Sequence, residues 1–96
     1  MKIKYAVNCL AKLGHSTRLS IYRLLVQAGH RGLTVGEIGK RLGITPTTLN
    51  HHLEHLRSSD LIRKEREGRH VWCHANFELM DLLIQFLSEV CCVEEK

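Results

Sequence analysis

Apolar residues recur three or four positions apart over most of the chain, which is the spacing that places them on one face of an α-helix. The first such stripe comprises Ile3, Val7 and Leu10. Gly14 is expected to end this first helix. Ser16 or Thr17 then caps a second helix, which Gly29 ends. This part of the chain therefore predicts two consecutive helices.

A third and a fourth helix follow, separated by a very short link. Thr34 and Glu37 have the spacing of a capping box, in which the Thr side chain caps the helix and the Glu side chain binds the Thr backbone. Gly43 suits the position just after a helix, and Thr45 with Pro46 suits the start of the next one. Two helices joined so closely are typical of a helix-turn-helix.

Beyond the fourth helix the helical period gives way to an alternation. Residues 62–66 and 70–75 are expected to form two strands around a turn at Glu67-Gly68, as a β-hairpin. A last helix is expected from about Phe77 to Cys92. Its apolar stripe comprises Leu79, Leu82, Leu83, Phe86, Leu87 and Val90. This stripe is too apolar for a lone terminal helix of a small domain, so we expect a second copy of the chain to cover it.

The predicted order of elements is α-α-α-α-β-β-α, a mostly α fold with a β-hairpin wing. We expect residues 1–96 to form a single winged helix-turn-helix domain, since a chain of this length suffices for one domain and not for two. No stretch approaches the ~20 apolar residues that span a bilayer, and the first residues do not have the pattern of a signal peptide. The expected location is therefore the cytoplasm, with no membrane partner.

Charge is unevenly distributed along the chain. Residues 1–76 contain 13 of the 14 Lys and Arg and 5 of the 10 Asp and Glu, a balance of +8, whereas residues 77–96 carry −4. A basic body of this kind suits a polyanion as partner. Because many basic domains never bind nucleic acid, charge alone does not identify that partner.

The fourth helix has an outward face suited to reading DNA. If Leu49 is the centre of its buried side, the ~3.6-residue turn points the polar residues of its N-terminal half outward. These residues are Thr47, Thr48, Asn50 and His51. Asn pairs with adenine through two hydrogen bonds, and Thr offers a hydroxyl and a methyl group. Thr and Asn are also common at the start of any helix, so this face alone leaves both interpretations open.

The hairpin that follows favours DNA. It carries four cations, Arg63, Lys64, Arg66 and Arg69. Such side chains neutralise the phosphates that flank a recognition helix, which supplies affinity while the helix supplies sequence choice. We therefore expect double-stranded DNA as the partner, contacted by both groups of residues.

Four segments form an ordered set of motifs along the chain. They are LGHSTRL at residues 13–19, LGITP at 42–46, HHLEHL at 51–56 and REGR at 66–69. This set resembles the ArsR/SmtB family of winged-helix metalloregulators and covers nearly the whole chain. The resemblance implies a homodimer formed by the first and last helices, which represses transcription at an inverted-repeat operator. It also implies release by an inducer, with no cofactor needed for DNA binding. Asp60 stands where the family usually has Gly, and Asp tolerates a left-handed conformation.

The segment from His51 to His55 also matches a motif of one class of zinc peptidases. In that interpretation His51 and His55 hold zinc and Glu54 acts as the base. A domain this small has no room for a substrate cleft, and the other face of the helix is used by the core. We therefore expect no enzymatic activity, with His51 facing DNA and His52 packed against the core. The remaining histidines, His15, His30, His70 and His74, are scattered along the sequence and show no spacing typical of metal ligands.

The cysteines are candidates for binding an inducer. The resembling family's thiol site on the third helix needs Cys within residues 33–38, and its zinc site on the last helix needs His, which does not occur after residue 74. Cys91-Cys92 is similar to the paired-cysteine ending of some arsenic-responsive members. Arsenite is thiophilic and favours three thiolates. The resemblance thus implies arsenite or antimonite as inducer, with Cys91 and Cys92 as two metal ligands and Cys9 as the candidate third.

Two other interpretations of these thiols stay open. In the first, Cys9 forms a disulfide or polysulfide bridge with Cys91 or Cys92, which makes the protein a redox or persulfide sensor. In the second, the pair consists of two thiols without a role near a frayed helix end. The protein then binds DNA constitutively or serves as a protein-interaction module. Cys73 lies on the strand face expected to point inward, so core packing is its expected role.

Overall fold

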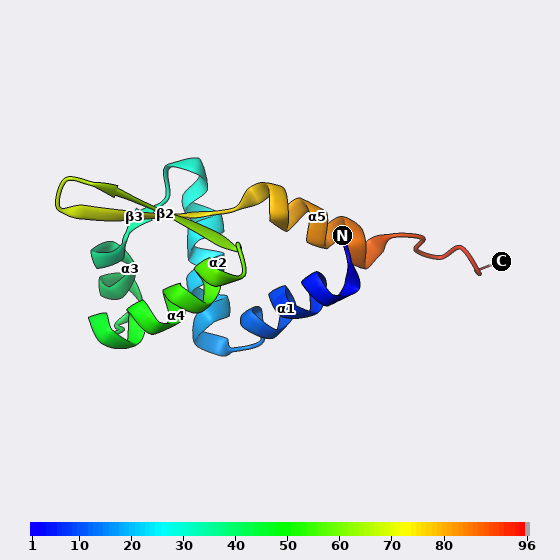
Figure 1. The fold of residues 1–96 in the computed structure, drawn as a ribbon, viewed down its shortest axis with the longest axis horizontal. Helices are drawn as coiled ribbons and strands as arrows, with labels where there is room; N and C mark the ends of the chain where they lie inside the picture. The colour runs from blue at the N-terminus through cyan, green and yellow to red at the C-terminus, as the bar shows by residue number, and fades with distance from the viewer. Residues whose placement is uncertain (96) are drawn as a thin grey trace.

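The computed structural model of the protein describes residues 1–95 and has the winged helix-turn-helix fold that the sequence predicts (Figure 1). The elements are α1 (Ile3–Leu13), α2 (Ser16–Ala28), the short 3-10 helix η1 (Gly29–Arg31), β1 (Leu33–Thr34), α3 (Val35–Leu42), α4 (Pro46–Ser58), β2 (Ile62–Glu67), β3 (His70–Ala75) and α5 (Phe77–Ser88). In Figure 1, α3, α4 and the β2–β3 hairpin lie at one end of the molecule, and α1 and α5 lie at the other. Among residues 1–95, no helix has the length and apolar character needed to cross a lipid bilayer.

Local sequence determines the ends of α3 and the start of α4. The capping box is formed as predicted: the Glu37 amide donates to Thr34 Oγ1 at 3.1 Å, and the Thr34 amide donates to Glu37 Oε1 at 3.0 Å. Gly43 follows α3 with a left-handed φ of 65°, and Pro46 begins α4. The turn of the helix-turn-helix is therefore set by residues that the sequence already indicates.

The start of α2 differs from the prediction. Ser16 and Thr17 lie inside the helix, and the N-cap is His15, whose Nδ1 accepts a hydrogen bond from the Thr17 amide at 3.2 Å. Ser and Thr are the commoner N-cap residues, but a neutral imidazole nitrogen can accept the same bond. His15 thereby has a structural role that its spacing in the sequence did not indicate.

The wing belongs to a three-stranded antiparallel sheet with the order β1-β3-β2. The β2–β3 hairpin lies where it was predicted, but β1 was not predicted because two residues are too few to show an alternation. In this short strand Leu33 pairs with Cys73, and Thr34 pairs with Trp72. At the preceding Gly32, an added Cβ would lie 2.1 Å from the Cys73 carbonyl oxygen. Only glycine therefore lets this segment approach β3 so closely.

One core joins the helices to the inner face of the sheet. Its fully buried members are Cys9, Ile21, Leu25, Ile38, Leu49, Leu53, Leu56, Leu61, Ile62 and Cys73. The burial of Cys73 confirms the prediction for that residue. Cys9 is buried as well, because α1 lies against the end of α4 and places its Sγ 3.8 Å from the Ser59 carbonyl oxygen. The next residue, Asp60, has a left-handed φ of 62°, as the resemblance implied.

Helix α5 is shorter than predicted and turns a different set of apolar residues to solvent. It ends at Ser88 rather than near Cys92, and Val90 and Cys92 have left-handed φ values of 53° and 62°. Leu79 and Leu83, expected on the uncovered stripe, are each only 6% exposed because they pack against the chain's own core. The exposed apolar residues of the helix are Leu82, Ile84 and Leu87. The spacing shows that a helix has an apolar side, but not which part of that side its own domain covers.

Candidate nucleic-acid interface

The exposed side of α4 carries the polar residues that the sequence predicts to face DNA. Leu49 and Leu53 are buried beneath the helix, which turns its opposite side to solvent. The exposed residues of its N-terminal half are Thr47, Thr48, Asn50 and His51. The Thr45 hydroxyl donates to Thr48 Oγ1 at 3.2 Å, a contact that holds this side chain at the first turn. Their exposure is what a recognition helix requires, and base contacts by them stay a prediction.

A hollow of about 550 Å³ lies between α4, the start of α3 and the wing. Asn50, Lys64 and Arg69 line it together with Lys40 of α3. Three cations beside the outward face of α4 suit the sugar-phosphate backbone next to a base-reading helix. Lys40 was not predicted as a site residue, since only its position in the tertiary structure distinguishes it from the other lysines.

The wing cations do not all face this hollow. Side chains alternate between the two faces of strand β2, which separates Arg63 from Lys64, whereas Arg66 lies farther along the strand toward the turn. Lys64 faces α4, where its Nζ lies 4.0 Å from Glu54 Oε2. Arg63 lines a hollow near the start of α5 instead, and Arg66 lines one beside Trp72. Of the four predicted wing cations, the structure therefore brings Lys64 and Arg69 to the hollow beside α4 and places Arg63 and Arg66 elsewhere.

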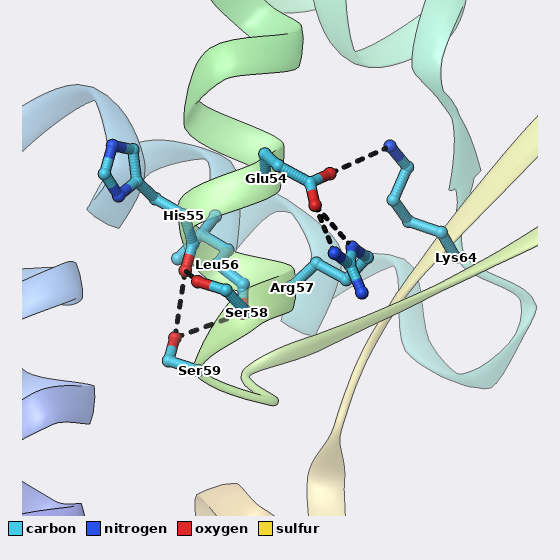
Figure 2. Close-up of polar contacts among 7 residues, drawn as sticks. All are labelled: Glu54, His55, Leu56, Arg57, Ser58, Ser59 and Lys64. Atoms are coloured by element: carbon cyan, nitrogen blue, oxygen red, sulfur yellow. Dashed lines mark hydrogen bonds and ion pairs between the residues drawn. The ribbon is translucent and has the colours of Figure 1, made fainter.

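Cations balance the charge of Glu54, the acidic residue of α4 (Figure 2). Arg57 donates to Glu54 Oε1 through Nε at 2.8 Å and also through Nη2, and Lys64 approaches the other carboxylate oxygen. The hydrogen bond from Arg57 is the main cause that lowers the pKa of the Glu54 carboxyl. Glu54 is therefore ionised, but its charge is compensated on the helix that would approach DNA phosphates.

The zinc-peptidase motif does not form a metal site. The rings of His51 and His55 lie with centroids 4.7 Å apart, but the carboxylate of Glu54 is directed toward Arg57 and Lys64 and not toward His55 (Figure 2). Within residues 1–95, no three His, Cys, Asp or Glu side chains are placed to hold a metal ion. Of the other histidines, His15 contacts α4, with its ring 4.7 Å from that of His52, a contact that the sequence did not indicate. His52 is buried, as predicted.

The four cysteines lie in two environments. Cys9 and Cys73 are fully buried, and burial raises the pKa of both thiols, that of Cys73 to about 11. Cys91 and Cys92 are exposed beyond the end of α5, with Sγ atoms 3.0 Å apart. In Figure 1 this segment extends away from the rest of the molecule. Among the described residues, Cys9 and the exposed pair do not come together as one site.

The sequence matches a model of the helix-turn-helix domain over residues 13–65, more than half of the chain. The chain belongs to the helix-turn-helix domain family. The matched residues contain α2, α3 and α4, including the exposed face of α4. This helix-turn-helix protein is similar to the HTH-type transcriptional regulator YgaV of Escherichia coli strain K12. The two are 26% identical over 87 residues, which are 91% of this chain and 86% of YgaV.

Solved structures share the fold of this helix-turn-helix protein. The transcriptional repressor BigR from Xylella fastidiosa matches with a TM-score of 0.70 at 27% identity, over 90% of this chain and 85% of BigR. The homodimeric winged helix-turn-helix DNA-binding domain of Mb0332 from Mycobacterium bovis, a possible ArsR-family transcriptional regulator, matches with a TM-score of 0.74. Its identity is 23%, over 93% of this chain and 82% of that domain. The chain shares its winged-helix fold with Mb0332. The relatives that are more than 25% identical to it are named as transcriptional regulators and not as enzymes, which confirms the prediction that the protein is not an enzyme.

Proposed function

We propose that the protein is a homodimeric transcriptional repressor that binds an inverted-repeat operator in double-stranded DNA. The observation that carries this proposal is the exposed polar face of α4 beside a hollow lined by three cations. The helix supplies hydrogen-bonding groups for base edges, and the cations attract phosphates. The similar protein BigR is named a transcriptional repressor, which favours repression over activation.

Exposed apolar residues on α1 and α5 support the homodimer. They are Ile3, Val7 and Leu10 on α1, and Leu82, Ile84 and Leu87 on α5. Tyr5 and Leu82 line the same hollow, so the two helices are neighbours at one end of the molecule (Figure 1). Apolar side chains gathered in this way mark a protein interface. A second copy related by a two-fold axis covers them and positions two α4 helices for half-sites about one helical turn apart.

For release from the operator we propose a thiophilic ligand at Cys91 and Cys92, with arsenite or antimonite as the candidates. Both thiols are exposed, and their Sγ atoms are close enough for one arsenic atom to bind both. Cys9 supplies the third thiolate only if α1 moves away from Ser59, against which the thiol is buried. That movement would disturb the α1 part of the interface and thus the spacing of the two α4 helices.

A thiol-based redox or persulfide sensor is the second candidate. An oxidant or a persulfide would then bridge Cys9 to Cys91 or Cys92. This candidate needs only two thiols, whereas arsenite favours three and the described residues bring only the two exposed thiols of Cys91 and Cys92 together. Here too Cys9 must leave its buried position, so both candidates predict the same movement of α1.

Selection from random duplex DNA tests the proposed function. We expect purified, reduced protein to select a two-fold symmetric sequence and to bind it about a thousandfold or more tightly than random DNA. A selected sequence without symmetry, or equal affinity for random DNA, contradicts the proposal. Counting the free thiols lost when arsenite or a persulfide releases the DNA distinguishes the two inducers, since arsenite consumes three thiols per site and an oxidant consumes two.

A further inference from the structure

Four histidines and a lysine form a continuous row along α4 and its neighbours α1 and α2. The rings of His51 and His55 lie with centroids 4.7 Å apart, and so do the rings of His15 and His52. The two pairs are neighbours, since the ring centroids of His51 and His52 lie 5.9 Å apart. The ammonium group of Lys12 donates to Nδ1 of His55 at 3.2 Å, which extends the row to the end of α1. Residues far apart in the sequence are thus brought to one side of the recognition helix.

Among residues 1–95, the one carboxylate that borders this row, that of Glu54, is already paired with cations. Arg18 of α2 faces the row, held by a 2.7 Å hydrogen bond from its Nε to the Lys12 carbonyl oxygen. Glu54 borders the row, but its carboxylate is bound by Arg57 of α4 and lies 4.0 Å from Lys64 of β2 (Figure 2). Apart from Glu54, the charged side chains that face these histidines are the cations Lys12 and Arg18, which oppose the addition of protons.

The pKa values of two of these histidines are lowered in agreement with that arrangement. For His52, burial is the first cause, followed by the charges of His15 and Arg18. For His55, burial is again the first cause, followed by the charge of Lys12. His52 and His55 are therefore neutral near neutral pH, and a protonated His55 can no longer accept the hydrogen bond from Lys12.

An anion would change this balance. A hollow of about 340 Å³ beside α4 is lined by Lys12, His51 and His55, together with Glu54 and Ser58. The hollow is next to His51, which also belongs to the exposed face of α4. A phosphate group placed there would accept hydrogen bonds from Lys12 and from protonated imidazoles, so their mutual repulsion would be replaced by attraction to one anion.

We propose that this row is a second contact with the DNA backbone, in which Lys12, His51 and His55 hold a phosphate group and the histidines take up protons as DNA binds. The proposal rests on the proposed DNA-binding function. The protein would then contact phosphates at two places: in the hollow beside the wing, and on the side of α4 next to α1. Because proton binding and phosphate binding favour each other, the affinity for DNA increases as the pH falls.

The free protein follows the opposite trend. A histidine with a lowered folded-state pKa is neutral in both states above about pH 6.5, and below that the unfolded chain binds more protons than the folded chain. Acidification therefore destabilises the fold through His52 and His55 while it strengthens DNA binding. A general effect of acid on folding would weaken binding instead, so the two trends separate the proposal from a loss of structure.

The test is the association constant of the full chain with a 5′-labelled duplex at constant ionic strength, measured from about pH 8 to about pH 6. We expect a gain of about three- to tenfold, equivalent to uptake of roughly half a proton to one proton over the range where the histidines titrate. The gain should be much reduced in His51→Gln and in the double variant with His55→Gln, because Gln keeps hydrogen-bonding capacity and does not titrate. Lys12→Gln should lower the slope of log affinity against log salt by about one.

Two controls make the result decisive. His30→Gln should keep the full gain, since His30 contacts Phe77 and lies outside the row. His70 lines the hollow beside the wing, so a gain that disappears in His70→Gln and persists in His51→Gln would overturn the proposal. An affinity independent of pH would overturn it as well and leave the DNA-binding function intact. Absence of DNA binding at every pH would overturn both. His51 is exposed, so its variant is expected to fold.

Discussion

The hydroxyl of Tyr5 donates a 2.7 Å hydrogen bond to Oδ2 of Asp60, which joins α1 to the turn between α4 and β2. The side chain of Asn76, the N-cap of α5, donates to the main-chain oxygen of the same Asp60 at 2.9 Å. Asp60 thus connects the end of α4 to both helices of the proposed dimer interface. Glycine at this position would relax the left-handed backbone but would lose the bond to Tyr5.

We expect Tyr5→Phe to lower the free energy of unfolding by about 0.5–1.5 kcal/mol, because it removes this hydrogen bond. Urea unfolding of the variant measures the loss. Tyr22→Phe is a matched control, since the buried Tyr22 hydroxyl has no hydrogen-bond partner among the described residues. Its removal is expected to cost nothing, so equal losses in the two variants would contradict the role given to Tyr5.

The same bond predicts a change of stability in alkaline solution. The hydrogen bond to Asp60 raises the pKa of Tyr5 from 10.0 to about 12. Because the folded-state pKa lies above the unfolded value, this contribution to stability is complete below about pH 10 and is lost as the pH rises toward 12. Ultraviolet titration of the phenolate in a Tyr22→Phe background reports Tyr5 alone. In Asp60→Asn its pKa should return toward 10.0, and an unchanged value would exclude Asp60 as the cause.

A charge on the exposed face of α5 should prevent dimerisation. We expect Leu87→Glu to shift the protein to monomers at micromolar concentration and to weaken operator binding, because two carboxylates would be buried at a two-fold interface. Sedimentation equilibrium measures the shift. Leu19→Glu adds the same charge to an exposed apolar position on α2, outside the proposed interface, and should stay dimeric. A wild-type protein that is monomeric in this experiment would refute the homodimer.

The two groups of DNA-binding residues should respond differently to substitution. Asn50→Ala should cost roughly 1–3 kcal/mol on the selected operator and much less on random DNA, if Asn50 reads a base. Arg69→Ala should weaken binding to both kinds of DNA and lower the salt dependence by about one unit of slope. Arg63→Ala is the comparison, since Arg63 lies outside the hollow beside α4 and should have the smallest effect. Fluorescence anisotropy titrations at several salt concentrations measure the DNA affinity of each of the three variants and its salt dependence.

The proposed inducer site makes a prediction for each cysteine. Cys91→Ser and Cys92→Ser should keep operator affinity and lose release by arsenite, because the exposed pair supplies two ligands. Cys73→Ser should keep both properties and lower only stability, since that thiol is buried in the core. Release is measured as DNA affinity with and without arsenite. A full response in Cys9→Ser would show that the site uses two thiolates or another donor.

Much of the fold could be predicted from the sequence because its signals are local. The capping box of Thr34 and Glu37, the glycine after α3 and Pro46 at the start of α4 each act within a few residues of the chain. The helical period likewise identified Leu49 and Leu53 as the buried side of α4, which left its polar residues outside. Caps and helix faces involve residues within about one turn of each other along the chain. The regular backbone of a helix fixes their relative positions, so the spacing in the sequence is enough to predict them.

The remaining features depend on which elements meet in space. The period of α5 could not show that its own core buries Leu79 and leaves Ile84 exposed, and nothing near Cys9 in the sequence indicates its burial against Ser59. The contact of His15 with His52 and the bond of Tyr5 to Asp60 join residues from different helices and turns. Sequence by itself therefore determined the order of the helices, the capping box of α3, the start of α4 and its polar face. Tertiary packing decided which side chains are buried and which charges become neighbours, because burial and electrostatic interactions involve residues that are far apart in the sequence but close in space.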